Sequence, residues 1–391
     1  MKRVAILGST GSIGQQTLDV AARHPDRFEV VALSAGSRVA GLAEQARRFG
    51  VRTVSCAAER DVPQLRAGVA SGVRVESGAA GLLAVAAESG AEIVVAATDG
   101  MVSFEAVAAA LERGIDVALA NKELLVAAGE LLLAAAASGR ARLLPIDSEH
   151  SALFQCLVGE PRERVASLVL TASGGPFWRT DAAVMRSASV ADALAHPTWR
   201  MGTKNTVDSA TMMNKGLEVI EAARLFGLPA ERIDVLVHPT SIVHGFAVFT
   251  DGSVKAQLAS PDMRVPIGYA LAYPDRLPGE PPADPLAAIG AQAGAQALTL
   301  AFERPDFERF VCLRLAYDAL RTGGTATAVL SAANEVAVTA FVEERLRFGE
   351  IAEVVEAALD GIPAEPLSWE SLAEADARAR TLARDRVAAK A

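Results

Sequence analysis

Short runs of β-branched residues alternate with longer Ala- and Leu-rich segments over the first 146 residues of this 391-residue chain. The apolar runs predict strands at Val4–Leu7, Phe28–Leu33, Thr53–Cys56, Glu92–Ala97, Asp116–Ala120 and Leu143–Ile146. Segments of helical periodicity lie between most of them, at Gly14–Arg23, Val39–Phe49, Phe104–Arg113 and Glu123–Ala137. Strands that are apolar throughout and alternate with helices are typical of a parallel sheet covered on both faces. We therefore predict an α/β fold whose N-terminal domain is a doubly wound sheet.

The pattern changes after Ile146. Loops rich in Gly, Ser, Pro and His follow, with alternating strands at Asp234–Val237, Gly245–Phe249 and Ser253–Leu258. The dipeptide Asp251-Gly252 separates the last two strands and is a strong hairpin signal. This part is predicted to be a central α+β domain with an antiparallel sheet.

Five prolines between Pro274 and Pro285 mark an extended linker, and the remaining sequence has helical periodicity without strands. The predicted domains are an N-terminal doubly wound domain at 1–146, a central α+β domain at 147–273 with a mobile segment at about 173–203, a linker at 274–300 and a C-terminal helical bundle at 301–391.

Composition excludes several classes of function. The net charge is −9 without a basic run, and aromatic residues make up only 5%, so nucleic acids and anionic membranes are poor partners. Three widely spaced cysteines, Cys56, Cys156 and Cys312, fit neither a disulfide scaffold nor a cysteine-rich zinc site. No apolar stretch approaches the roughly 20 residues of a membrane span. We expect a cytoplasmic protein.

A glycine-rich loop follows the first strand directly. It reads Gly8-Ser9-Thr10-Gly11-Ser12-Ile13-Gly14 and precedes a predicted helix. Glycines at this spacing let backbone amides approach a pyrophosphate at the helix N-terminus, as in Rossmann-type domains. The second strand ends without the acidic residue that usually binds the ribose of NAD, and Ser37 and Arg38 follow it. Because Arg binds phosphate bidentately, we predict NADP(H).

Two polar segments further along predict a metal and an anion site. Asp147 and Glu149 follow the sixth strand and, in extended chain, would point to the same side at the carboxyl end of the sheet, where they suit Mg²⁺ or Mn²⁺. In the second segment, Asn214 and Glu218 are spaced to share one helix face beside Lys215. Glu218 is a candidate third metal ligand, and Ser209, Asn214 and Lys215 are candidates for binding a phosphate.

A candidate lid lies between these segments. Gly174-Gly175-Pro176 is a predicted hinge, and Trp199 and Met201 would form an apolar cover that excludes water. Among the histidines, His196 on this lid is the preferred candidate for the site.

The motifs, taken together, closely resemble those of the 1-deoxy-D-xylulose 5-phosphate reductoisomerase family. In order they are GSTGSIG at the N-terminus, ANKE (Ala120–Glu123), DSEH (Asp147–His150), SGGPF (Ser173–Phe177), HPTWRMG (His196–Gly202), DSATMMNKGLE (Asp208–Glu218), HPTSIVHG (His238–Gly245), SPDMRVPI (Ser260–Ile267) and ANEVAV (Ala333–Val338). The resemblance implies rearrangement and NADPH-dependent reduction of 1-deoxy-D-xylulose 5-phosphate to 2-C-methyl-D-erythritol 4-phosphate, with Mg²⁺ or Mn²⁺, in non-mevalonate isoprenoid biosynthesis. It also implies a homodimer.

The resemblance further assigns roles to individual residues. The cofactor would contact Thr10, Gly11, Ser12, Ile13, Gly36, Ser37, Arg38, Asn121, Glu123 and Gly202. The metal ligands would be Asp147, Glu149 and Glu218, and the catalytic residues Lys122, Glu149, Glu218 and His196. The substrate would contact Lys122, Ser148, Glu149, Ser173, His196, Trp199, Ser209, Asn214, Lys215 and Glu218.

The chain departs from the family at three positions, where other members commonly carry Asn in place of Arg38, Gln in place of Thr240 and Gly in place of Ala259. Two alternative functions remain open at this point. One is an aspartate-semialdehyde-type NADP dehydrogenase, which would need a nucleophilic cysteine such as Cys156. The other is an NADP(H) sensor without catalytic activity, which would not require three convergent carboxylates.

Overall fold

The computed structural model describes residues 1–196, 201–279, 284–291 and 295–390. The chain divides into two compact units, which are described separately. Unit 1 comprises Met1–Leu124, Glu130–Ser151 and Asp262–Gly279, and unit 2 comprises Leu125–Gly129, Ala152–Pro261 and Glu280–Ala391. The predicted Trp199 and the neighbouring residues of the lid lie outside the described residues.

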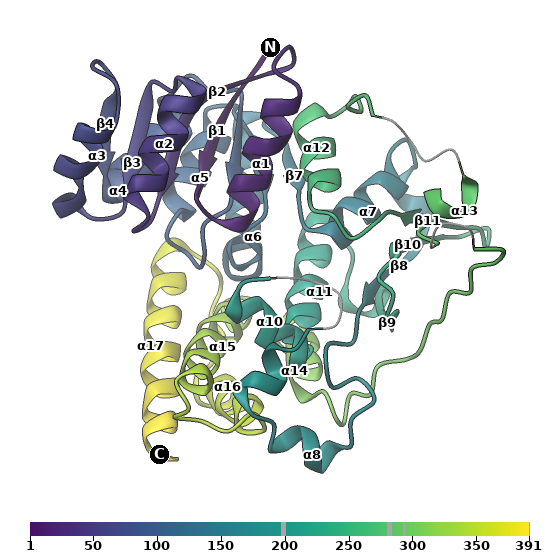
Figure 1. The fold of residues 1–391 in the computed structure, drawn as a ribbon. Coiled ribbons are helices and arrows are strands. Elements are labelled where there is room, and N and C mark those ends of the chain that lie inside the picture. Colours follow the sequence, from purple (N-terminus) through teal and green to yellow (C-terminus); the bar gives the residue numbers. More distant parts are fainter. Residues whose placement is uncertain (197–200, 280–283, 292–294, 391) are drawn as a thin grey trace. The chain divides into compact units, whose positions relative to one another are not determined.

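Unit 1 contains a seven-stranded sheet in which every neighbouring pair is parallel. Its strands are β1 (Lys2–Leu7), β2 (Phe28–Ala35), β3 (Thr53–Cys56), β4 (Arg74–Ser77), β5 (Ile93–Ala96), β6 (Asp116–Leu119) and β7 (Leu143–Pro145). The spatial order is β4-β3-β2-β1-β5-β6-β7 (Figure 1). The predicted doubly wound sheet is confirmed, but β4 was not predicted because Arg74 and Glu76 interrupt its apolar pattern at the edge of the sheet.

Helices connect these strands in sequence order. They are α1 (Ser12–Arg23), α2 (Val39–Phe49), α3 (Val62–Gly68), α4 (Gly78–Ala87), α5 (Phe104–Glu112) and α6 (Lys122–Gly139), with a 3₁₀ turn η1 (Glu59–Asp61) before α3. The direction in which strands are added reverses between β4 and β5, so the carboxyl ends of β1 and β5 diverge into connections on opposite faces. This switch point is where open α/β sheets bind ligands.

The chain returns to unit 1 late in the sequence to add α12 (Arg264–Ala272). This helix packs against α1 and against the β6 and β7 side of the sheet. Its residues from Pro266 to Ala272 are buried, so the first unit is completed only after a large part of unit 2 has been traversed.

Unit 2 contains a four-stranded sheet in the order β11-β10-β8-β9. Its strands are β8 (Val165–Ala172), β9 (Ile233–Val237), β10 (Val243–Phe249) and β11 (Val254–Leu258). The predicted hairpin is confirmed: β10 and β11 are antiparallel, and Gly252 takes φ +85° in the turn. The prediction of a purely antiparallel sheet is wrong, because β8 and β9 are parallel and are connected through helices.

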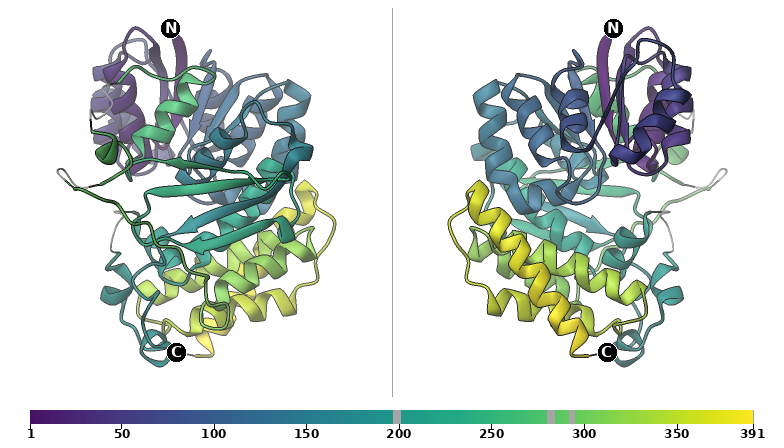
Figure 2. Two further views of the ribbon diagram at one scale, coloured as in Figure 1. Left: turned by 90° about the vertical axis from the view of Figure 1, so that its right-hand side faces the viewer. Right: turned by 90° about the vertical axis from the view of Figure 1, so that its left-hand side faces the viewer.

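Helices make up the rest of unit 2. They are α8 (Ala182–Arg186), α9 (Val190–Leu194), α10 (Thr203–Ala210), α11 (Met213–Phe226), α13 (Pro285–Ala288), α14 (Val311–Thr322), α15 (Ala326–Val342), α16 (Glu350–Gly361) and α17 (Trp369–Ala388), with 3₁₀ turns η2 (Arg162–Arg164) and η3 (Ala230–Arg232). The predicted C-terminal helical bundle is confirmed, with α15 packed against both α16 and α17 (Figure 2). Helix α7 (Ser148–Leu157) begins in unit 1 and continues into unit 2.

Helix α11 lies between α14 and the strands β8 and β9. Buried residues occur around its whole circumference, which is typical of a helix inside a domain. Charged side chains in such a helix are costly, yet Lys215, Glu218 and Glu221 are all buried there. Buried charges of this kind indicate a functional site.

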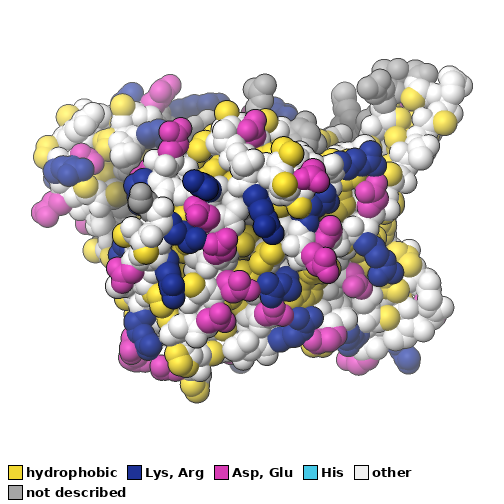
Figure 3. Space-filling model, turned by 90° about the horizontal axis from the view of Figure 1, so that it is seen from below, with side chains coloured by type: hydrophobic (Ala, Val, Ile, Leu, Met, Phe, Trp, Pro, Cys, Tyr) yellow, Lys and Arg dark blue, Asp and Glu magenta, His cyan; other side chains and the backbone are white. Residues whose placement is uncertain are grey.

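Among the described helices, none combines the length and the apolar character needed to cross a bilayer. Lys and Arg side chains are intermingled with Asp and Glu over the face of the molecule seen in Figure 3.

Candidate active site

The glycine loop lies between the end of β1 at Leu7 and the start of α1 at Ser12. Gly8 takes φ +86°, and a Cβ built on it would lie 2.3 Å from the carbonyl oxygen of Ala97. A Cβ on Gly14 would lie 2.4 Å from the carbonyl oxygen of Gly8. The loop therefore tolerates no side chain at these two positions, and Gly11 caps α1 without a side-chain hydrogen bond. Open backbone amides at a helix N-terminus suit a pyrophosphate.

A cavity of about 660 Å³ adjoins this loop within unit 1. Thr10, Ser37 and Arg38 line it, together with Gln45 and Gln64. Arg38 is exposed at the N-cap of α2, and Gly36 and Ser37 beside it are exposed as well. Thr10 of the loop and Ser37 and Arg38 of the predicted 2′-phosphate site therefore lie at one cavity, whereas the other predicted residues Gly11, Ser12, Ile13 and Gly36 do not line it.

Asn121, Lys122 and Glu123 begin helix α6 where β6 ends, and all three are buried. Asn121 caps the helix by accepting a hydrogen bond from the Leu124 amide at 3.3 Å, and its Nδ2 donates to the carbonyl oxygen of Gly100 at 2.7 Å. Lys122 Nζ lies 2.6 Å from Asp147 Oδ2. The cap and the ion pair fix these side chains at the carboxyl edge of the sheet.

Asp147 and Glu149 do not lie in an extended segment, and that part of the prediction is wrong. Helix α7 begins at Ser148, and the Ser151 amide donates to the Asp147 carbonyl oxygen at 2.8 Å. This hydrogen bond between residues four apart is the bond of a helical turn, and an extended chain could not form it. Ser148 Oγ donates to Glu149 Oε2 at 2.5 Å. Both carboxylates still follow β7 directly, and the helix N-terminus favours their negative charge.

The start of α11 carries the second predicted cluster. Asn214 Nδ2 donates to Glu218 Oε1 at 2.5 Å, so the predicted sharing of one helix face is confirmed. Lys215 Nζ pairs with Glu218 Oε2, and both of these side chains are at most 4% exposed. Glu218 belongs to unit 2, whereas Asp147 and Glu149 belong to unit 1. The joint binding of a metal by these three residues stays a prediction.

Ser173, His196 and Ser209 converge within unit 2. His196 Nε2 lies 3.1 Å from Ser173 Oγ and 3.1 Å from Ser209 Oγ. Burial lowers the pKa of His196 below its usual value, so the imidazole is neutral at pH 7. Gly174 and Gly175, at φ +85° and +64°, turn the chain after β8 so that Ser173 faces this point. Two hydroxyls and an imidazole can together hold an oxyanion.

Gly202 and Met201 are the described residues of the predicted lid motif that follow its undescribed part. Gly202 is exposed and is the N-cap of α10, whose last residues include Ser209. The predicted contact of Gly202 with the cofactor stays a prediction.

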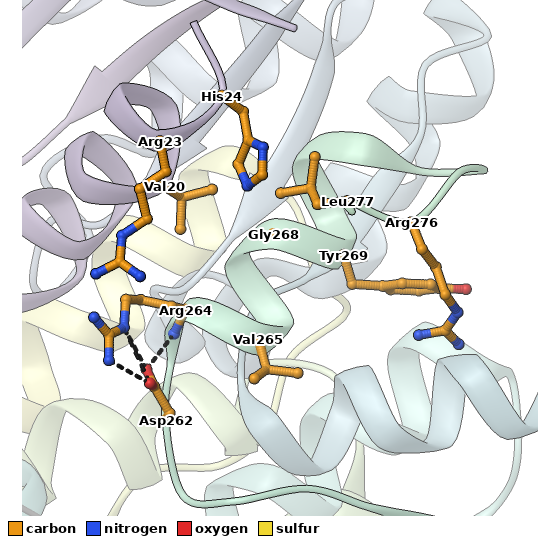
Figure 4. Close-up of a pocket in the computed structure, with 10 residues that line it drawn as sticks. All are labelled: Val20, Arg23, His24, Asp262, Arg264, Val265, Gly268, Tyr269, Arg276 and Leu277. Carbon is orange, nitrogen blue, oxygen red and sulfur yellow. Dashed lines mark hydrogen bonds and ion pairs between the residues drawn. The ribbon is translucent and has the colours of Figure 1, made fainter. Parts of the chain in front are cut away.

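A second cavity in unit 1 involves residues to which sequence reasoning gave no role. It has a volume of about 330 Å³ and lies between α1 and α12 (Figure 4). Arg264 on its wall bonds Asp262 through both Nε and Nη2 and also reaches Asp19 on α1 at 3.2 Å. The pairing anchors the start of α12 to the helix that follows the glycine loop. Asp262 and Arg264 belong to the SPDMRVPI motif, so the sequence offered them as candidates, but nothing in the sequence points to Asp19.

Comparison with known proteins gives a consistent result. The family model described as 1-deoxy-D-xylulose 5-phosphate reductoisomerase matches residues 4–129, and its two C-terminal domain models match 143–226 and 258–382. A reductoisomerase of that name from Anaeromyxobacter dehalogenans is 50% identical, over 100% of this chain and 98% of the relative. One from Trichlorobacter lovleyi is 48% identical, over 98% of this chain and 97% of the relative.

Solved structures of the same enzyme also match. The reductoisomerase of Zymomonas mobilis in complex with NADPH superposes with a TM-score of 0.90 at 41% identity, covering 99% of each chain. A reductoisomerase in complex with NADPH, fosmidomycin and magnesium has a TM-score of 0.90 at 39% identity, covering 99% of this chain and 98% of that one.

Proposed function

Since the chain belongs to the 1-deoxy-D-xylulose 5-phosphate reductoisomerase family, we propose that it converts 1-deoxy-D-xylulose 5-phosphate, NADPH and a proton to 2-C-methyl-D-erythritol 4-phosphate and NADP⁺. The observation that carries this proposal is the polar cluster along α10 and α11. Ser209 meets His196 and Ser173 there, and Lys215 and Asn214 surround the buried Glu218 a few residues later. This is a site for a phosphate next to a carboxylate ligand.

NADPH fits the residues of unit 1. Thr10, Gly11, Ser12 and Ile13 offer the pyrophosphate a loop that leaves no room for a Cβ at Gly8 or Gly14. Gly36, Ser37 and Arg38 would hold the 2′-phosphate, since a guanidinium donates two parallel hydrogen bonds to phosphate oxygens. Asn121, Glu123 and Gly202 would contact the nicotinamide side. The relatives' structures with NADPH support this assignment.

Asp147, Glu149 and Glu218 would hold a divalent metal. Carboxylate oxygens are the ligands that Mg²⁺ and Mn²⁺ prefer, and the magnesium in a relative's structure favours Mg²⁺. When bound, such an ion stabilises negative charge that develops on the carbonyl and hydroxyl oxygens of the substrate. Lys122 and Lys215, each paired with one of these carboxylates, reduce the repulsion between them.

The other polar residues would bind and orient the substrate. Ser173, Ser209, Asn214 and Lys215 would hold its phosphate together with His196, whose neutral imidazole both accepts and donates hydrogen bonds. Ser148 and Lys122 would contact its sugar oxygens near the nicotinamide. Trp199 and the lid would exclude water while the carbon skeleton rearranges to a branched aldehyde, which then accepts the hydride.

The proposal also includes the organisation of the protein. We assign cofactor binding to residues 1–146, catalysis to 147–273, linkage to 274–300 and structural support to 301–391. A homodimer and a cytoplasmic location are supported by the family resemblance, and the location also by the three free, buried cysteines.

The decisive experiment follows NADPH absorbance with 1-deoxy-D-xylulose 5-phosphate as substrate. Parallel reactions contain Mg²⁺, Mn²⁺ or EDTA, and one set replaces NADPH with NADH. We expect decay that requires the metal and prefers NADPH, with 2-C-methyl-D-erythritol 4-phosphate as product. Protein that binds NADPH but shows no decay in any reaction would refute the proposal and favour a sensor.

A further inference from the structure

Asp208 is a buried carboxylate that none of the proposed catalytic steps uses. It is 0% exposed and directly precedes Ser209 in α10. Lys204 Nζ binds its Oδ2 at 2.8 Å, and Asn334 Nδ2 donates to its Oδ1 at 2.7 Å. Both carboxylate oxygens are thus held, one from the same helix and one from α15, 126 residues later.

Asn334 is an unexpected residue at its position. It is 0% exposed, and Ala332, Ala333 and Ala337 around it are buried as well. Its Oδ1 is buried and has no hydrogen-bond partner among the residues that the structure describes. An unsatisfied buried acceptor costs free energy that an apolar side chain of the same size would avoid. Since packing alone would favour such a side chain, the amide is explained by its donation to Asp208.

The position of Asp208 determines the position of Ser209. Successive residues of a helix are separated by about 100° around its axis, so Asp208 can face α15 while Ser209 faces His196. After Ser209 the chain turns through Met212, a non-glycine residue at φ +61°, and α11 begins with Met213, Asn214 and Lys215. A shift of Asp208 would therefore move one end of the polar cluster relative to the other.

We propose that Asn334 and Asp208 are positioning residues for the phosphate subsite and that the C-terminal helical bundle thereby sets the affinity for the substrate phosphate. This inference rests on the proposed function, because it takes the cluster of Ser173, His196 and Ser209 to be the phosphate subsite. It assigns the ANEVAV motif a role in the reaction although Asn334 touches neither the substrate nor the cofactor.

The test replaces Asn334 with Leu, which has a similar size and cannot donate. We expect the KM for 1-deoxy-D-xylulose 5-phosphate to rise about tenfold or more, as follows from losing one hydrogen bond to a buried charge. kcat should change by less than about threefold, because the reacting atoms are untouched. The inhibition constant of inorganic phosphate should rise in parallel with the KM, and the Kd of NADPH should stay the same.

Thr327→Val is the matched control, since Thr327 lies on the same helix, is also 0% exposed and has a buried hydroxyl with no hydrogen-bond partner in the described part of the chain. It should leave the KM and the phosphate inhibition unchanged. Unchanged KM and phosphate inhibition in a folded Asn334→Leu variant would overturn the proposal.

A swapped pair provides a second test that does not depend on Asn334→Leu folding. Asn334→Asp alone places two carboxylates against each other and should abolish phosphate binding. Combining it with Asp208→Asn restores an amide–carboxylate pair and should recover most of the affinity. A folded double variant that binds inorganic phosphate no better than Asn334→Asp would also overturn the proposal. Phosphate binding is measured by calorimetry without the sugar, so a failure of the proposed function remains distinguishable.

Discussion

Glu218 is a buried carboxylate whose hydrogen-bond and ion-pair partners lie on the same helix. The carboxylate is 1% exposed and would be strongly destabilising without partners, since desolvation of an isolated charge costs several kcal/mol. Asn214 and Lys215 satisfy it through bonds to both oxygens. These partners come from the same turn of α11, so the cluster forms together with the helix.

Glu218→Gln keeps the size of the side chain and removes its negative charge. We expect turnover to fall by about 100-fold or more, because a metal ligand supplies several kcal/mol of charge stabilisation. Binding of NADPH, measured by fluorescence, should remain nearly unchanged. Glu231→Gln at an exposed position is the control and should have full activity. Normal turnover of the Glu218 variant would exclude Glu218 as a metal ligand.

Arg38 is the residue on which the preference for NADPH is expected to depend. Arg38→Ala should raise the KM for NADPH by about 10- to 100-fold, which corresponds to one charge-assisted contact of 1.5–3 kcal/mol. NADH has no 2′-phosphate and cannot make this contact. Its KM should therefore stay the same and serves as the internal control. An equal change in both constants would show that Arg38 acts on folding or on the shared part of the cofactor.

At the level of elements, the turn between β1 and α1 is determined by close packing. The backbone of Gly14 approaches that of Gly8 and Ser9 so closely that no other residue fits without a shift. Thr10 of the same turn lines the cavity that Arg38 also lines. We therefore expect stability and cofactor binding to be coupled in this one loop.

Gly14→Ala tests this coupling. Its Cβ would meet the Gly8 oxygen at 2.4 Å, so we expect a loss of about 1–3 kcal/mol in the free energy of unfolding and a weaker affinity for NADPH. In contrast, Gly41→Ala in α2 meets only a Thr10 methyl at 3.7 Å and should stabilise the protein by about 0.5–1 kcal/mol. Urea unfolding measures the change in the free energy of unfolding for both variants. Equal changes in the two variants would contradict the role of the tight turn.

At the level of the whole molecule, the three cysteines lie in the interiors of both units. Cys56 belongs to unit 1, and Cys156 and Cys312 belong to unit 2. Burial raises the pKa of the Cys156 thiol to about 11 and that of the Cys312 thiol to about 12, and it also raises the pKa of Cys56. A nucleophilic cysteine requires a lowered pKa, so Cys156 does not suit the dehydrogenase alternative.

Thiol alkylation at pH 8 should accordingly leave activity intact. Since the pH lies well below the raised pKa values of Cys156 and Cys312, those two thiols stay protonated, and burial blocks access to all three cysteines. We expect mass spectrometry to show complete labelling of the three cysteines only when the protein is unfolded in denaturant. Loss of activity in step with labelling of native protein would restore the dehydrogenase alternative.

Much of the local structure could be predicted from the sequence. β1, β3 and the hairpin at Asp251-Gly252 are determined by residues close in the chain, through apolar runs and turn chemistry. The edge strand β4 and the parallel pairing of β8 with β9 were not predictable, because they depend on which segments become neighbours. The extended geometry expected at Asp147 failed for a similar reason: the hydrogen bonds of a helix start outweigh local strand propensity.

The candidate residues could thus be identified from the sequence alone, since glycine spacing, charge type and the order of the motifs can be read from it directly. Their convergence was decided by tertiary structure alone. His196 meets Ser173 across 23 positions, and Asp208 meets Asn334 across 126. The physical reason is that side-chain periodicity specifies which face of an element is polar, whereas only the packing of the whole domain specifies which two polar faces come into contact.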